Sequence, residues 1–93
     1  MEEKFISAWA QAREQAAQLG VRMRPVEEKD AMKTAHRALE GNRESDGFGA
    51  LEDKGRLDLS LEALAVDRRF TALFTDEEAN TALSRLLDAG YRF

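Results

Sequence analysis

The sequence predicts a single all-α domain spanning residues 1–93, built as a small bundle of four to five helices. Three observations support this fold class. Apolar residues recur at spacings of three and four along most of the chain, as on one face of a helix. Four of the six glycines stand directly after such a segment, where a helix can end: Gly20, Gly41, Gly55 and Gly90. A chain of 93 residues is long enough for one domain with a small core.

The first predicted helix runs from Glu2 to Leu19 and is unusually apolar around its circumference. One face carries residues in a four-three spacing: Phe5, Trp9, Ala12, Ala16 and Leu19. Ile6, Ala10 and Ala17 widen this face to an arc of about 200°, twice the roughly 100° that packs on a core. Gly20 can end the helix in a left-handed cap.

The wide apolar arc predicts that part of this helix contacts another chain. The predicted interaction surface consists of Phe5, Ile6, Trp9, Ala10, Ala17 and Leu19. We expect a homodimer or higher homo-oligomer, since two-fold symmetry is the commonest arrangement, and an unidentified protein partner is the other possibility. The alternative is that the alanines simply face water.

The next segment alternates apolar and basic residues over Val21–Arg24, which predicts a short extended piece. Pro25 fits the first turn of a second helix that runs to Leu39 and ends at Gly41. This helix has a thin apolar stripe: Met32, Ala35 and Leu39.

Residues 42–58 carry the weakest pattern. Phe48 and Leu51 are three residues apart, which favours a short helix ending at Gly55, with Ser45 or Asp46 as its N-cap. A β-hairpin that turns at 53–55 is the alternative.

Residues 59–89 are predicted to be helical again, with Asp58 or Ser60 as a cap and a break near Val66. A short 68–74 helix should bury Phe70 and Phe74. Thr75 and Glu78 match a capping box at the start of an amphipathic last helix, which Gly90 ends. Residues 91–93 form an aromatic tail that could be extended.

Candidate catalytic and metal-ligating residues are scarce. The chain has no Cys and one His, His36, whose nearest acidic neighbour on the same helix is Glu40. No nucleophile motif or phosphate-binding loop accompanies it. The loop from Asn42 to Asp53 resembles an EF-hand in its ligand spacing, but Asp53 stands where a bidentate Glu is needed. We therefore expect no catalysis, no metal and no cofactor.

A nucleic-acid-associated regulator is one alternative function. A possible basic patch consists of Arg22, Arg24, Arg68 and Arg69. The net charge of −4 and the acids at 76–78, which would meet phosphates in a helix-turn-helix, disfavour nucleic acid. The other alternative is a small-ligand-binding protein, which an apolar pocket lined by Trp9, Phe70 or Phe74 with a few polar groups would favour.

No apolar run reaches the length of a membrane span and the N-terminus lacks a signal-peptide pattern, so we expect no membrane contact and a cytoplasmic location. The Ala-, Leu- and Arg-rich composition is typical of bacterial proteins.

Residues 59–64 together with 67–70 are similar to a helical stretch near the C-terminus of argininosuccinate-type lyases, whose signature and catalytic parts are absent here. Residues 89–93 resemble the end of a leader domain of peptide precursors. Both segments are too short to imply a function.

Overall fold

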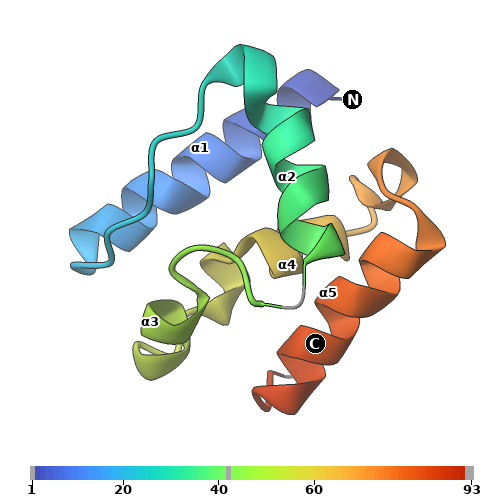
Figure 1. Ribbon diagram of the computed structural model, residues 1–93. Helices are drawn as coiled ribbons and strands as arrows, with labels where there is room; N and C mark the ends of the chain where they lie inside the picture. The colour runs from blue at the N-terminus through green and yellow to red at the C-terminus, as the bar shows by residue number, and fades with distance from the viewer. Residues whose placement is uncertain (1, 42, 92–93) are drawn as a thin grey trace.

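The computed structural model describes residues 2–41 and 43–91 and confirms the all-α fold class (Figure 1). These residues form five α-helices: α1 (Glu2–Gln18), α2 (Ala31–Glu40), α3 (Phe48–Asp53), α4 (Leu61–Ala65) and α5 (Asp76–Asp88). Three single 3-10 turns join them: Glu28–Asp30, Leu57–Leu59 and Thr71–Leu73. The described residues contain no strand, so the piece at 21–24 is extended without pairing, and residues 92 and 93 of the predicted tail lie outside the description.

The core forms where α4 packs against both α1 and α5, and α2 against α5. An aromatic cluster joins α1 to the chain on either side of the Thr71–Leu73 turn: Phe5, Trp9, Phe70 and Phe74. The Phe5 ring lies 5.5 Å from Phe70 and 5.4 Å from Phe74 in edge-on geometry, and 5.8 Å from Trp9. Such pairs add to the stabilisation from burial alone. The predicted burial of Phe70 and Phe74 is confirmed, although only a 3-10 turn forms between them.

The second helix begins at Ala31, so the prediction that Pro25 opens it is wrong. Residues 21–27 instead run alongside α1 as an extended segment (Figure 1). Val21 is buried in the core, and the Arg24 N–H donates to the Asp46 carboxylate at 2.6 Å. These contacts hold the segment against distant parts of the chain. They cannot be predicted from the position of Pro25 in the sequence.

The short helix after the 42–47 loop is confirmed, and the hairpin alternative is wrong. Its predicted cap is also wrong. Gly47 occupies the N-cap with φ +82°, and no side chain caps the helix. The Ser45 side chain is hydrogen-bonded to Glu62 of α4, and Asp46 to Arg24, so neither residue is available as a cap.

Helices α4 and α5 both begin after N-cap residues that the sequence predicts. The Ser60 hydroxyl accepts a hydrogen bond from the Ala63 N–H at 3.2 Å and so caps α4. At α5 the Thr75 hydroxyl accepts from the Glu78 N–H at 3.1 Å, and the Glu78 carboxylate accepts from the Thr75 N–H at 2.8 Å. The predicted capping box is therefore confirmed. Among the described residues, no helix combines the length and the apolar character needed to cross a bilayer.

Candidate ligand-binding site

A cavity of about 260 Å³ lies between α1, the extended segment, α2 and the loop that precedes α3. We call it the Trp9 cavity. Its lining comprises Trp9, Arg13, Met23, Arg24, Pro25, Val26, Thr34, Ala38, Ser45, Asp46 and Leu61. Helices α1, α2 and α4 supply the rigid walls, and two connecting segments supply the rest, an arrangement that often carries binding function.

Trp9 and Arg13 form the α1 wall of the cavity. They are one helical turn apart, and the guanidinium carbon of Arg13 lies 5.4 Å from the centre of the indole ring, within cation–π range. Trp9 is only 5% exposed, because its ring also packs on Phe5. Burial lowers the pKa of Arg13, but a guanidinium stays charged at neutral pH.

Two nitrogen donors in this wall are buried without a partner. Within the described parts of the chain, neither the indole Nε1 of Trp9 nor the Nε of Arg13 has a hydrogen-bond partner. Buried side-chain donors are nearly always satisfied in native proteins, so each exception needs an explanation. Both nitrogens belong to residues that line the cavity, although neither nitrogen is itself exposed to it.

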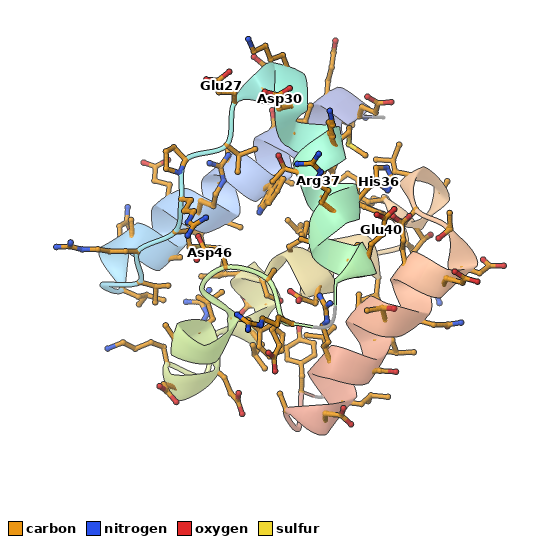
Figure 2. All side chains as sticks on the ribbon, in the orientation of Figure 1. Glu27, Asp30, His36, Arg37, Glu40 and Asp46 are labelled. Atoms are coloured by element: carbon orange, nitrogen blue, oxygen red, sulfur yellow. The ribbon has the colours of Figure 1, made fainter. Side chains whose placement is uncertain are left out.

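The extended segment and the loop before α3 meet and close one side of the cavity. Asp46 lies on this loop and accepts the Arg24 N–H (Figure 2). Beside it the Gly47 backbone comes so close to Met23 that a Cβ at Gly47 would lie 2.8 Å from the Met23 Cγ. Only glycine allows both this approach and the φ of +82°.

A buried ion pair supports the same loop from the core side. Glu62 is fully buried and accepts hydrogen bonds from Ser45 through the backbone N–H at 2.8 Å and the hydroxyl at 2.5 Å. Arg85 donates to Glu62 at 3.0 Å, and also to the carbonyls of Ala38 at 3.0 Å and Gly41 at 2.8 Å. These contacts tie α5, α4 and the end of α2 to the Ser45 loop.

The sequence prediction missed this ion pair, although two signals were present. Glu62 is a lone charge within the apolar run Leu59–Ala65. Arg85 follows Ala82 by three residues and so shares the inner face of α5. Neither observation identifies the other residue as the partner, because Glu62 and Arg85 are 23 residues apart in the sequence.

His36 does not pair with Glu40, its nearest acidic neighbour on the same helix. Its Nδ1 lies 2.6 Å from the Glu78 carboxylate, and its ring lies 5.2 Å from that of Phe74 (Figure 2). Burial works to raise the pKa of Glu78, but hydrogen bonds from the Thr75 N–H and His36 outweigh it, so the pKa lies below its ordinary value. His36 thereby supports the capping box of α5.

Residues 2–41 and 43–91 also hold no group of three acids or histidines able to bind a metal.

The structure divides the predicted interaction surface. Phe5 and Trp9 lie in the core, so in the folded chain they are not available to a partner. Ile6 and Leu19 are half-buried against the same core, which leaves Ala10 and Ala17 exposed. Among the described residues, the exposed large apolar side chains lie elsewhere, on α5, where Leu83 is 36% and Leu87 56% exposed.

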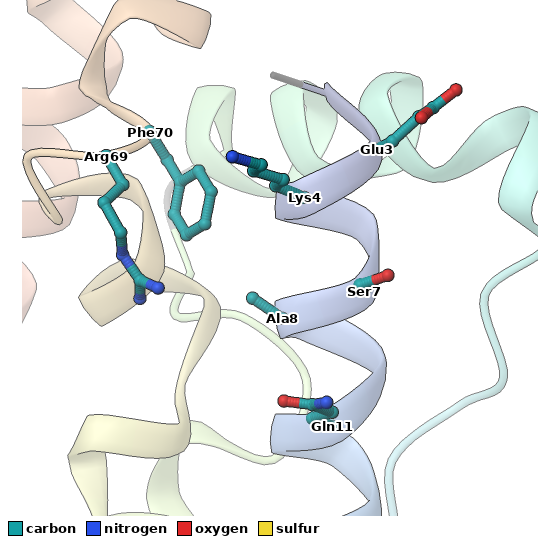
Figure 3. Close-up of a pocket in the computed structure, with 7 residues that line it drawn as sticks. All are labelled: Glu3, Lys4, Ser7, Ala8, Gln11, Arg69 and Phe70. Atoms are coloured by element: carbon teal, nitrogen blue, oxygen red, sulfur yellow. The ribbon is translucent and has the colours of Figure 1, made fainter.

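The four arginines of the predicted basic patch are all exposed, but two of them lie against opposite sides of α1. Arg69 lies over the Phe70 ring and lines the same hollow as Lys4 and Ala8 (Figure 3). It is also paired with Asp67 at 3.0 Å. Arg24 lines the Trp9 cavity with Arg13, about 140° around α1 from Ala8. Arg24 and Arg69 therefore lie on different sides of α1 and do not share one basic face.

Arg69 and Phe70 border a second, broader hollow of about 810 Å³ along α1 (Figure 3). Its other lining residues are Glu3, Lys4, Ser7, Ala8 and Gln11. Its polar side chains are exposed to water, and the Arg69 charge already has a partner in Asp67. Size alone does not make it a better site, because the polar side chains that line it are exposed to water.

Comparisons of the chain with protein families, with curated proteins and with solved structures each found no match.

Proposed function

We propose that this protein is a small-ligand-binding protein and that the ligand occupies the Trp9 cavity. One observation carries the proposal: a cavity of about 260 Å³ lies between three helices and two connecting segments, and most of the side chains that line it are apolar.

The lining of the cavity supports the same proposal. Ligand sites are concave, largely apolar, and carry a few polar groups that fix orientation. Here Met23, Val26, Ala38 and Leu61 supply apolar surface, and polar residues such as Thr34 complete the lining. A dry cavity of about 150 Å³ can hold benzene, so this larger one has room for a ring or short alkyl chain with a head group. In this proposal the protein acts by binding and not by catalysis.

Calorimetric titration with two matched acid–amide pairs tests the proposal: phenylacetate with phenylacetamide, and hexanoate with hexanamide. We expect at least one probe to bind, and Ala38→Phe, which fills the cavity from α2, to abolish that binding. Ala50→Phe is the matched control, because Ala50 is exposed on α3. Absence of binding by all four probes at millimolar concentration contradicts the proposal, as does binding that Ala38→Phe leaves unchanged.

Self-association is a second candidate function, and the exposed Leu83 and Leu87 favour it. They are one turn apart on α5 and so share a face that another copy of the chain could cover. Light scattering after size exclusion should then give twice 10.5 kDa or more at micromolar concentration. Leu87→Glu should then give a monomer. Ala10→Glu tests instead the surface that the sequence predicts on α1. A wild type that is monomeric throughout this range removes this candidate.

A further inference from the structure

We propose that residues 22–26 form a gate over the Trp9 cavity, which the hydrogen bond between Arg24 and Asp46 holds closed. We call these residues the gate segment. The inference rests on the proposed function and adds to it the route by which the ligand enters and leaves. Its structural basis is that the gate segment lines the cavity, yet one hydrogen bond joins it to the rest of the described chain.

The gate segment supplies more of the cavity lining than any one helix does. Four of its residues line the cavity: Met23, Arg24, Pro25 and Val26. The segment runs alongside α1 in an extended conformation without a helical turn (Figure 1). Outward displacement of these residues would uncover the cavity while α1, α2 and α4 keep their places.

Hydrogen bonds hold the gate segment less firmly than they hold the helices. Residues inside a helix are bonded to the next turn through their backbone groups. Within residues 2–41 and 43–91, the gate segment makes one hydrogen bond to another part of the chain, from the Arg24 N–H to the Asp46 carboxylate at 2.6 Å. Segments with so few hydrogen bonds open at a lower free-energy cost than core helices do.

Side-chain packing adds a contact at the same point. Met23 lies against Gly47, the neighbour of Asp46, so closely that a Cβ at Gly47 would lie 2.8 Å from the Met23 Cγ. Two consecutive residues of the gate segment therefore meet two consecutive residues of the loop before α3, and we call this crossing the latch. Opening would withdraw two side chains from the core, Met23 and Val26, and both are only half-buried.

The loop side of the latch is fixed. Ser45, next to Asp46, donates to Glu62 through both its backbone N–H and its hydroxyl. Glu62 is fully buried and paired with Arg85. Moving the loop would take hydrogen-bond donors away from a buried carboxylate, which is costly. When the latch releases, the gate segment moves and the loop stays in place.

Both ends of the gate segment are anchored. Val21, just before it, is buried, and its N–H donates to the Ala16 carbonyl at 2.9 Å. After it, the Glu28–Asp30 turn leads into α2, whose first residue, Ala31, is buried. The motion is therefore confined to a short segment between two fixed points, as in the loops that close over many ligand sites.

Quenching of Trp9 fluorescence by acrylamide measures the opening without any ligand. Trp9 is the one tryptophan of the chain, its ring lines the cavity, and it is 5% exposed. Asp46→Leu keeps a side chain of similar size that cannot accept the Arg24 N–H. We expect it to raise the fraction of open molecules about tenfold, the effect of losing a hydrogen bond to a charged group, and to raise the quenching constant severalfold. Asp46→Asn retains an acceptor and should stay close to wild type.

Two controls separate gate opening from other effects. Asp53→Leu makes the same substitution at an exposed position of α3 and should leave quenching unchanged. Thr75→Ala weakens the fold through the α5 cap and leaves the latch intact. Quenching of Asp46→Leu that matches wild type overturns the gate. An equal rise in Asp46→Leu and Thr75→Ala also overturns it, because access of the quencher would then follow general unfolding.

The rates of ligand exchange test the link to the proposed function, with whichever of the four calorimetric probes binds. Asp46→Leu should raise the association and dissociation rates together by about tenfold and leave Kd nearly unchanged, because the probe enters and leaves through the open state. A rise in the dissociation rate alone would show that Asp46 contacts the probe and would contradict the gate. If no probe binds, the proposed function fails, and the quenching measurement still decides whether the segment opens.

Discussion

Arg85 and Glu62 form an ion pair of 3.0 Å inside the protein, where the Glu62 side chain is fully buried and that of Arg85 is 10% exposed. Neither charge would be stable there alone. Because Glu62 also holds both polar groups of Ser45, the pair fixes the loop that closes the Trp9 cavity. Stability and the candidate site therefore depend on the same two residues.

Removing one member of this pair should be costly. We expect Arg85→Met to lower the free energy of unfolding by about 3–5 kcal/mol, because it leaves the Glu62 charge buried without its partner. Urea denaturation followed by circular dichroism measures the loss. The double variant Glu62→Leu/Arg85→Met should regain much of it. The control is Arg56→Met, which breaks an ion pair with Asp58 that is nearly half exposed, and should change little. An Arg85→Met variant as stable as Arg56→Met contradicts this role.

The capping box at α5 gives a second prediction. Thr75→Ala should reduce stability by about 0.5–2 kcal/mol, because the Glu78 N–H loses its acceptor. Thr75→Ser keeps the hydroxyl and should recover most of the difference. A thermal melt that is the same for Thr75→Ala and wild type would show that the cap contributes nothing.

Glu78 makes stability depend on acidic pH. Its pKa is lower in the folded state than in the unfolded chain, so its contribution is fully present above the ordinary glutamate pKa of about 4.3. The contribution is lost as the pH falls through the lowered folded-state pKa. We expect urea unfolding free energies to fall less steeply between neutral pH and pH 3 in Glu78→Gln than in wild type. Parallel pH profiles for the two proteins contradict the assignment.

Gly47 is predicted to tolerate no side chain. Gly47→Ala should cost more than Gly55→Ala, although both glycines have positive φ, of +82° and +69°. Backbone strain of about 1–3 kcal/mol is common to both substitutions. Only at Gly47 does the new Cβ also meet Met23, at 2.8 Å, whereas nothing lies within 4 Å at Gly55. The extra loss should disappear in a Met23→Ala background, and its persistence there would refute the contact.

The sequence predicted the features that depend on neighbouring residues. The α1 face, the Ser60 and Thr75 caps and the short helix before Gly55 are local patterns, and all are confirmed. The features that it missed depend on contacts between distant segments. Pro25 is extended because Arg24 bonds to Asp46, and Ser45 caps nothing because Glu62 engages it.

The candidate site could be predicted only in part for the same reason. The sequence named Trp9 as a residue that an apolar pocket would include, and the structure places it in the cavity wall. It could not show that α1 turns Arg13 toward the Ser45–Asp46 loop, since these residues are more than 30 positions apart. Phe70 and Phe74, the other two residues named for such a pocket, pack on Phe5 in the core.

The nuclear magnetic resonance signal of the Trp9 indole N–H tests the central claim most directly. The chain has one tryptophan, so the signal is unambiguous in a ¹H–¹⁵N spectrum. Titration with a probe that binds in calorimetry should shift this signal, because the Trp9 ring lines the cavity, and the shift should saturate at the affinity found by calorimetry. An indole signal that stays in place while the probe saturates the protein would show that the ligand binds elsewhere and contradict the account.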